Sequence, residues 1–541
     1  MTLEKKYNYL EKRIERLNNI SLSLSREEDV NVIFELILEE AKYITNADGR
    51  TLYMKDDDGM NMNFEILQND SMKIMRGGTS GKKIKLPQIP LVENGKPNMN
   101  NVNTYVAHTG ETLNITDAYK EEGFDFSGTM AMDERTGYRS KSFLNVPLKN
   151  HENDTIGVIQ LINSININNG DVQPFTLEMQ ELVESLASQG AVALTNKKLV
   201  LELENLFESF IKLIATAIDE KSPYTGGHCE RVPEIAMKLA DAVSNIEEGK
   251  YKNFSLSKDE SYELYIASWL HDCGKVATPV HIVDKAKKLE TITDRIEVIN
   301  TRFEVVKRDI EIEMLKKELE LEKGNKSSDK LNQIKLEYKN SINDLNRQNA
   351  FIKKINFGSE FIDKNEKKQI EKISEKKWIL NGKSVPLLEK MDIRNLQISK
   401  GTLLPEEREI INKHIDITID MLEKLPYPKK LKNVPEFAGG HHEKINGKGY
   451  PKGLVGDEMS IQAKIMAIAD IFEALTAKDR PYKKGKTLSE AMGILNDMKN
   501  NNEIDKDLFH IFVKKHIYKI YADKYLDKDQ IDEVDEFFLL S

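Results

Sequence analysis

Cysteine is scarce in this chain: Cys229 and Cys273 are the only two among 541 residues. So few cysteines cannot form a disulfide framework, and a reducing compartment is therefore expected. Each cysteine directly follows a histidine or aspartate of a polar motif. We expect both to be small buried apolar side chains, with redox sensing as the alternative.

Long apolar runs and an excess of positive charge are also lacking. No run approaches the roughly 18–20 apolar residues that a membrane span needs. The first segment, MTLEKKYNYLEKRIERL, is charged throughout, unlike a signal peptide. The formal net charge of -10 argues against binding the nucleic-acid backbone, which requires a basic face. We therefore expect a cytoplasmic protein with neither a membrane nor a nucleic acid as its partner.

The length and the hydrophobic pattern predict several domains. A chain of 541 residues is too long for one hydrophobic core. Residues 1–27 have the apolar spacing of an amphipathic helix, and residues 28–174 combine a helix with strand-like runs such as TLYMKD and TIGVIQLIN, as in an α/β domain. A long helix is predicted over 175–219, suited to transmitting strain or to forming a homodimer.

The rest of the chain is predicted to be helical and interrupted. We expect one all-α domain in two parts, 220–289 and 401–541, with an insertion at 290–400. The insertion is rich in Lys, Glu, Asn and Ile, and its apolar residues recur at intervals of three and four. This pattern favours an antiparallel helical hairpin broken at GNKSSD, with a disordered charged linker as the alternative.

Histidines occur in compact polar motifs within the helical region. The chain has ten histidines, and the motifs are YTGGHCERV, SWLHDCGKVATP, EREIINKHIDITIDML, GGHHEKINGKGYPKGL and IMAIADIFEAL. Their candidate donors are His228, His271, Asp272, His414, His441, His442 and Asp470. A lone histidine is more often an ordinary hydrogen-bonded residue, but five such motifs in one region favour a metal site.

These residue types suit a pair of divalent cations. Two cations about 3.5–4 Å apart need a bridging carboxylate, several imidazoles and open positions. On one predicted helix, His271 and Asp272 would point about 100° apart, so that His271 binds one cation while Asp272 bridges both. Imidazole and carboxylate together favour Fe, Mn, Zn or Ni over Ca or Mg. We expect two ions, Fe or Mn first, with Zn or Ni as the alternatives.

The motifs HDCGKVATP, HHEKINGKGYPKGL and ADIFEALTAKDRPYKKG resemble those of the HD-GYP family. This family belongs to the HD superfamily of metal-dependent phosphohydrolases and opens bacterial cyclic dinucleotides. The resemblance covers about 205–289 and 400–485. It implies the seven donors above as metal ligands, Asp272 and Lys275 as catalytic residues, and Lys275, Gly449, Tyr450 and Arg480 as substrate-binding residues.

Alternatives remain for several of these residues. Tyr450 can be part of an ordinary structural turn, and Arg480 can pair with Asp479 instead of binding substrate. In the Gly449-Tyr450-Pro451 turn, Pro451 fixes φ and we expect Gly449 to adopt a conformation that other residues avoid. Some family members bind a third metal through a Glu four residues before the first histidine. Tyr224 occupies that position here, so two metals are expected.

The N-terminal region resembles a GAF domain, a small-molecule sensor fold, over about 28–200. The resemblance is carried by MDERTGYRSKSFLNVPL and IGVIQLIN. It implies a mixed sheet between helices with a pocket on one side. Asp133 and Glu134 partly match the ion-pair motif of cyclic-nucleotide-binding GAF domains. The ligand can thus be a nucleotide or another metabolite, or the domain can bind none and serve dimerisation.

Together the two resemblances imply a GAF-regulated phosphodiesterase that acts on a cyclic dinucleotide, cyclic di-GMP first, yielding pGpG, GMP or both. Two alternatives stay open. The same centre could act on another nucleotide such as cyclic GMP-AMP. The chain could also be a non-catalytic receptor for a cyclic dinucleotide.

Overall fold

The structure, a computed structural model, describes residues 16, 18–221, 226–323, 328–357, 361–478 and 485–541. The chain divides into two compact units, Met1–Leu206 and Phe207–Ser541. Each unit has a hydrophobic core of its own. Of the helix predicted over 1–27, the described part is helical at residues 18–26.

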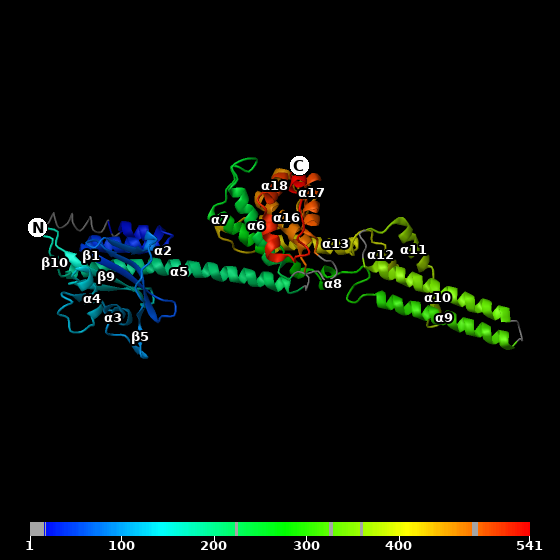
Figure 1. The fold of residues 1–541 in the computed structure, drawn as a ribbon, viewed down its shortest axis with the longest axis horizontal. Coiled ribbons are helices and arrows are strands. Elements are labelled where there is room, and N and C mark those ends of the chain that lie inside the picture. The colour runs from blue at the N-terminus through cyan, green and yellow to red at the C-terminus, as the bar shows by residue number, and fades with distance from the viewer. Residues whose placement is uncertain (1–15, 17, 222–225, 324–327, 358–360, 479–484) are drawn as a thin grey trace. The chain divides into compact units, whose positions relative to one another are not determined.

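The first unit is built on an antiparallel sheet covered by helices (Figure 1). Its six main strands follow the order β3-β2-β1-β9-β8-β7. Their bounds are Ala47–Lys55 (β1), Asn61–Asn69 (β2), Ile74–Gly77 (β3), Leu113–Ile115 (β7), Phe143–Lys149 (β8) and Thr155–Ile165 (β9). The short strands β4 (Ile89–Pro90) and β10 (Val172–Gln173) pair with β2 and β9. The strand-like runs of the sequence coincide with these elements, apart from Asp56 at the end of TLYMKD, which follows β1.

Helices pack on both faces of this sheet. Helix α2 (Val30–Thr45) and the first part of α5 (Leu177–Asp219) form the larger core with one face. Helices α3 (Val102–Thr109) and α4 (Ser127–Thr136) lie among the smaller clusters of the other face. The predicted α/β class is confirmed. The expected mixed sheet is wrong, because every strand pair along this path is antiparallel.

Helix α5 is one continuous element of 43 residues, as the sequence predicts. Its early residues Val183, Leu186 and Leu194 belong to the core of the first unit. Its late residues Ile211 and Ile218 belong to the core of the second. The division between the two units falls within this helix, after Leu206.

The second unit is a helical domain. Before the insertion it contains α6 (His228–Ser244), α7 (Lys258–Leu270), the short 3-10 helix η2 (Cys273–Ala277) and α8 (Val280–Val283). After the insertion come α13 (Pro405–Asn412), α14 (His414–Glu423), α15 (Val434–Gly439), α16 (Ile461–Thr476), α17 (Leu488–Asn500), α18 (Lys506–Lys514), α19 (Ile517–Tyr525) and α20 (Glu536–Leu540). Residues from both parts form one shared core, so the insertion interrupts a single domain.

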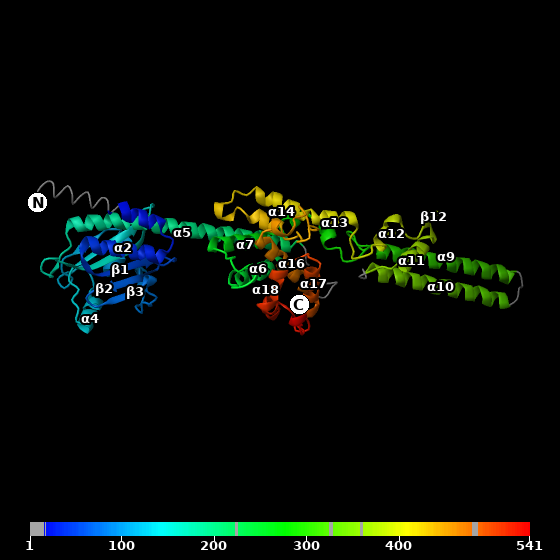
Figure 2. The same cartoon turned by 90° about the horizontal axis from the view of Figure 1, so that it is seen from above.

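The insertion contains the predicted helical hairpin. Figures 1 and 2 both show α9 (Ile296–Lys323) and α10 (Ser328–Asn356) side by side. They run antiparallel, because Lys335 near the start of α10 pairs with Glu318 near the end of α9. The hairpin is only part of the segment, since α11 (Lys364–Ser374), strands β11 (Lys377–Leu380) and β12 (Lys383–Pro386) and α12 (Lys390–Leu396) follow it. These elements share a separate small core.

Among the described residues, no helix has the length and apolar character needed to span a membrane.

Candidate metal centre

The seven predicted donors meet at one place in the second unit. They form two groups whose donor atoms lie within 4.8 Å of one another. The first group is His228, His271, Asp272 and Asp470, and the second is His414, His441 and His442. Segments from His228 to Asp470, far apart in the sequence of this unit, therefore contribute to a common cluster.

The first group has the spacing of ligands around one cation. The Nε2 atoms of His228 and His271 are 3.2 Å apart. His228 Nε2 also lies 3.2 Å from Asp272 Oδ2 and 3.2 Å from Asp470 Oδ1. Ligand atoms about 2.1 Å from a common metal are separated from their neighbours by roughly 3.0–3.4 Å. The donors thus already stand where a single cation would hold them.

Asp272 faces both groups, one oxygen to each. Its Oδ2 atom lies 3.3 Å from His271 Nε2, in the first group. Its Oδ1 atom lies 3.2 Å from His414 Nε2, in the second. A carboxylate presented in this way can bridge two cations.

The segment that carries Asp272 differs from the prediction of one helix. Helix α7 ends at Leu270, His271 is its C-cap, and Asp272 precedes η2. The change from an α-helix to a 3-10 helix alters the direction of the chain at His271 and Asp272. Lys275 is nevertheless on the same side as Asp272, with Nζ 2.5 Å from Asp272 Oδ2.

Helix ends orient three of the histidines. His271, His414 and His441 each place Nδ1 against the carbonyl oxygen three residues earlier, at 2.7, 2.5 and 2.6 Å. Those carbonyls belong to the last turns of α7, α13 and α15, where the regular hydrogen bonding of a helix ends. A carbonyl only accepts, so Nδ1 must carry the proton. Each Nε2 is left as a lone-pair donor that points into the cluster.

Unsatisfied polar atoms gather at the same place. Asp272 Oδ1, His414 Nε2 and His441 Nε2 are buried and have no hydrogen-bond partner of suitable geometry. Such atoms are costly unless something binds them. Cations between these donors would satisfy all three, so the residues present fit a metal centre.

The protonation of the two groups differs in the absence of cations. Burial lowers the pKa of His442 to about 4 and that of His441 well below its usual value, so both are neutral. Burial also lowers the pKa of His271, but the Asp272 carboxylate raises it more, to about 9. A metal bound by the first group would displace these protons.

Glu473 supports the first group and was missed by the sequence analysis. Its Oε2 atom lies 2.5 Å from His228 Nδ1, and Arg231 Nε donates to its Oε1 at 2.7 Å. Glu473 is 1% exposed, so its carboxylate is shielded from water. The signal that could have found it is spacing, because Glu473 follows Asp470 by three residues on the same helix.

Glu443 organises the loop after the paired histidines. It is buried, and its carboxylate accepts hydrogen bonds from the backbone amides of Lys452, Gly453 and Leu454 at 2.7, 3.2 and 3.0 Å. The loop that follows the Gly-Tyr-Pro turn is thereby closed on the segment that carries His441 and His442. The sequence analysis did not single out this residue either.

Gly449 is needed for space and not for its conformation. Its φ lies outside the left-handed region, contrary to the expectation from sequence. A Cβ atom on Gly449 would instead lie 2.3 Å from the Lys444 backbone nitrogen and 2.4 Å from Glu443 Cα. The glycine lets the turn pack directly against the chain after the histidines.

Tyr450 lies beside the second group. Its ring stacks on that of His442, with centroids 4.8 Å apart and planes 25° apart. The peptide bond between Tyr450 and Pro451 is cis. The stacking holds the His442 imidazole in place and keeps the ring of Tyr450 next to the second group of donors. Three other residues of the sequence analysis, Tyr224, Asp479 and Arg480, lie outside the described residues.

Gly274 allows the two halves of the centre to approach each other. A Cβ atom there would lie 2.0 Å from the His414 carbonyl oxygen and 2.6 Å from the Thr418 nitrogen. The Gly274 amide donates to Thr418 Oγ1 at 2.9 Å. The close packing of η2 on α14 sets the separation of Asp272 and His414. The adjacent Cys273, like Cys229, is buried and unpaired.

The end of α5 is attached to two ligand-bearing segments. Asp219 Oδ2 accepts the Cys229 amide at 3.0 Å, next to His228. Lys221 Nζ donates to the carbonyls of Lys275 and Thr278 at 3.3 and 2.8 Å, and also to that of Val276. These contacts fix the start of α6 and the end of η2 against the last residue of α5 and the turn that follows it.

Two family models match the chain. A GAF domain model matches residues 29–194, and an HD domain model matches residues 391–508. The HD match includes His414, His441, His442 and Asp470. It begins after most of the insertion and leaves out His228, His271 and Asp272, which the structure places in the same domain.

Curated relatives match over short segments. A 3'3'-cGAMP-specific phosphodiesterase 3 from Vibrio cholerae is 34% identical over 22% of this chain and 25% of its own length. A cyclic di-GMP phosphodiesterase from Thermotoga maritima is 42% identical over 17% of this chain and 25% of its own length. The matched part of the chain thus spans about a quarter of the length of these relatives.

A solved GAF domain/HD domain protein from Geobacter sulfurreducens also matches, at 13% identity and a TM-score of 0.23, over 32% of this chain and 98% of that one. Such a low score adds nothing to the assignment. The family models and the architecture agree: this chain carries a GAF domain followed by an HD domain.

Proposed function

We propose that the HD domain is a metal-dependent phosphodiesterase that hydrolyses a cyclic dinucleotide, with cyclic di-GMP as its substrate. Relatives named for cyclic di-GMP and for 3'3'-cGAMP hydrolysis support the substrate class. The matched HD domain supports a metal-dependent activity. The GAF domain would regulate this activity.

One observation carries the proposal: Asp272 directs its two oxygens to two separate groups of donors. The first group would hold one divalent cation and the second group another, with Asp272 between them. Fe or Mn is proposed for both sites, with Zn or Ni as the alternatives. When bound, such a pair lowers the pKa of a water molecule and polarises a phosphoryl oxygen.

The chain's own residues would bind and orient the substrate. Lys275 Nζ stands beside Asp272, and its side chain is about a quarter exposed. With cations bound beside Asp272, this ammonium group would be available to stabilise negative charge on the phosphodiester as the bond breaks. Gly449 and Tyr450 place the loop edge beside His442, where it can contact the substrate. Arg480 is proposed to bind substrate as well.

The test is hydrolysis of cyclic di-GMP by purified full-length protein supplied with Mn²⁺ or Fe²⁺. His271→Ala and Asp272→Ala should each abolish turnover while leaving the helical content unchanged. His281→Ala, which alters an exposed histidine of the same domain, should keep wild-type turnover. Normal hydrolysis by the first two variants in defined metal would overturn the proposal.

Cyclic GMP-AMP is the second candidate substrate, because three of the matched relatives are named 3'3'-cGAMP-specific phosphodiesterases. Rates on a panel of cyclic and linear dinucleotides would decide between the two. The mass of the product would show whether one phosphodiester bond is cut or both. Tight binding of a cyclic dinucleotide without turnover would instead identify a receptor, a reading that the complete donor set disfavours.

A small molecule is proposed as the ligand of the GAF domain. A cavity of about 520 Å³ lies between its sheet and α4, within the range of ligand pockets. Its lining combines apolar side chains such as Phe64, Leu67 and Met132 with Thr51 and Asp133. Asp133 accepts hydrogen bonds from Ser140 and Tyr119, so it holds the local loops together. A homodimer through the helices is proposed as the assembly in which this ligand acts.

A further inference from the structure

An apolar stripe runs along the exposed surface of α5. Along one line of this helix, six large apolar side chains are between 44% and 66% exposed: Val192, Leu199, Leu203, Leu206, Phe210 and Leu213. Solvated helices normally place charged residues at such positions. Exposed apolar surface of this extent, at regular spacing, indicates a surface that another helix covers.

The spacing of these residues is that of a coiled coil. With Asn196 included, the positions from Val192 to Leu213 follow one another at alternating steps of four and three. This assigns Val192, Leu199, Leu206 and Leu213 to heptad position d, and Asn196, Leu203 and Phe210 to position a. We call these seven residues the α5 seam. Leucine at d with a single asparagine at a is the pattern of a parallel two-stranded coiled coil.

The charges beside the seam permit a second copy in this orientation. Among the a, d, e and g positions from Val192 to Ala217, Glu202 is the one charged residue. In a parallel pair, position g of one helix faces the next position e of the other, so Glu202 would face Phe207 and not another acid. Val200 and Ile214, also at position e and about half exposed, widen the apolar stripe.

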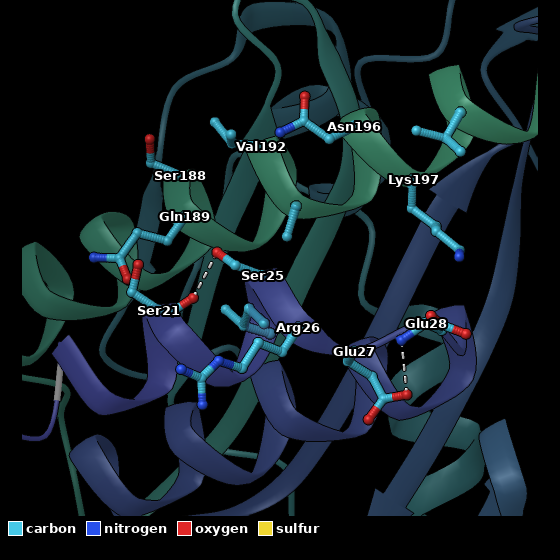
Figure 3. Close-up of a pocket in the computed structure, with 13 residues that line it drawn as sticks. Ser21, Ser25, Arg26, Glu27, Glu28, Ser188, Gln189, Val192, Asn196 and Lys197 are labelled. Carbon is cyan, nitrogen blue, oxygen red and sulfur yellow. Dashed lines mark hydrogen bonds between the residues drawn. The ribbon is translucent and has the colours of Figure 1, made fainter. Parts of the chain in front are cut away.

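The area is sufficient for a specific interface. Eight apolar side chains, each about half exposed, offer on the order of 500 Å² per copy. Two copies would bury roughly 1,000 Å², the area that a specific interface must reach. The seam begins beside a groove of about 490 Å³ between residues 21–28 and α5. Val192 and Asn196 are among the residues that line this groove, and Figure 3 shows both side chains on α5.

We propose that the α5 seam binds the same seam of a second copy as a parallel, in-register coiled coil, with Asn196 of each chain pairing across the interface. This proposal specifies the interface and the orientation of the homodimer named in the proposed function. Asn196 would fix the register, because any shift of one helix would bury its amide against leucine.

The first test is the mass of the full chain in solution by light scattering. The wild type should have twice the 62.0 kDa of one chain. Leu199→Glu combined with Leu203→Glu should give a monomer, because two charges per chain would be buried at the seam. Leu201→Glu is the matched control, since Leu201 is on the same helix and 42% exposed but lies off the seam at position f. A monomeric wild type, or a double variant that remains a dimer, overturns the proposal.

The second test determines the orientation by oxidative cross-linking. Val192→Cys and Leu206→Cys, tested singly, should each form a disulfide with the same residue of the second copy. An antiparallel pair could do so at one of these two positions at most, and that result overturns the parallel arrangement. Leu201→Cys should not cross-link. Because mass and cross-linking do not depend on hydrolysis, failure here is distinguishable from failure of the proposed phosphodiesterase activity.

Discussion

At the scale of single residues, Gly274 controls the distance between the two halves of the centre. Gly274→Ala would place a Cβ atom 2.0 Å from the His414 carbonyl oxygen, so η2 must move away from α14. We expect a cost of about 1–3 kcal/mol and a separation of Asp272 from His414. The melting temperature should fall by roughly 3–10 °C, and turnover should fall with it.

Gly493→Ala is the matched control for that substitution. Gly493 lies within α17, and a Cβ atom there would have no neighbour within 4 Å. Alanine in an open helix interior should stabilise the domain by about 0.5–1 kcal/mol. Equal effects of the two substitutions would contradict the role given to Gly274.

Glu473 is predicted to tune metal binding through His228. Glu473→Gln keeps the shape of the side chain but removes the charge that His228 and Arg231 share. Metal affinity should fall about 10–100-fold, measured by titrating metal-free protein with Mn²⁺. Glu423→Gln, an exposed change on α14, should leave the affinity unaltered. An unchanged affinity for the Glu473 variant would show that the contact is only structural.

The donors of the site were readable from sequence, whereas their supports were not. Each donor lies in a short motif of unusual composition, and the structure brings all seven together. Glu473 and Glu443 gain their meaning from partners elsewhere in the chain, on α6 and in the loop after Pro451. The conformation predicted for Gly449 was wrong, because the local sequence does not indicate where two backbone segments approach each other closely.

At the scale of secondary-structure elements, the end of α5 is predicted to position η2. Lys221→Met removes the hydrogen bonds to the carbonyls of Lys275 and Thr278. The backbone of Lys275 is then no longer held in place, so kcat should fall about tenfold, equivalent to about 1.4 kcal/mol. The metal content should stay at the wild-type value. Lys221→Arg should recover part of the rate. Lys238→Met, on the exposed face of α6, is the control, and a kcat for Lys221→Met equal to the control would contradict the prediction.

The shifted pKa of Asp505 predicts how acid affects the stability of the start of α18. Burial raises the pKa of Asp505, but hydrogen bonds from the Leu508 amide, Tyr251 and Lys250 lower it more, so the net shift is downward. A depressed carboxyl pKa stabilises the fold above the unfolded-state pKa of about 3.9, and this contribution is lost as the pH falls through the folded-state value.

Asp505→Asn should therefore destabilise the second unit by about 1 kcal/mol at pH 7. The difference from wild type should shrink once the pH falls below about 4. Urea unfolding followed by tryptophan fluorescence reports on this unit, because both tryptophans, Trp269 and Trp378, belong to it. A difference that grows on acidification would contradict the assignment.

Sequence patterns predicted the type of the elements better than their ends and pairings. The strands β1, β2, β8 and β9 and the long α5 follow from hydrophobic periodicity. The break between α7 and η2 at His271 does not, because the carbonyl that His271 caps becomes available only once the helix has ended. Strand direction likewise depends on long-range pairing, and the expectation of a mixed sheet came from the GAF resemblance and not from the strand patterns.

At the scale of the whole chain, the insertion separates the two halves of one centre. His228, His271 and Asp272 precede it, and the other donors follow it. The HD domain model accordingly matches only from residue 391. The prediction of one domain in two parts depended on assigning both sets of motifs to the same chemistry, and the shared core agrees with it.

The central claim is that two cations lie on either side of Asp272. Anomalous diffraction from crystals of the Mn²⁺-loaded protein tests it most directly. The account predicts two peaks, one among His228, His271 and Asp470 and the other among His414, His441 and His442, with Asp272 bound to both. A single peak, or peaks away from these side chains, would contradict it.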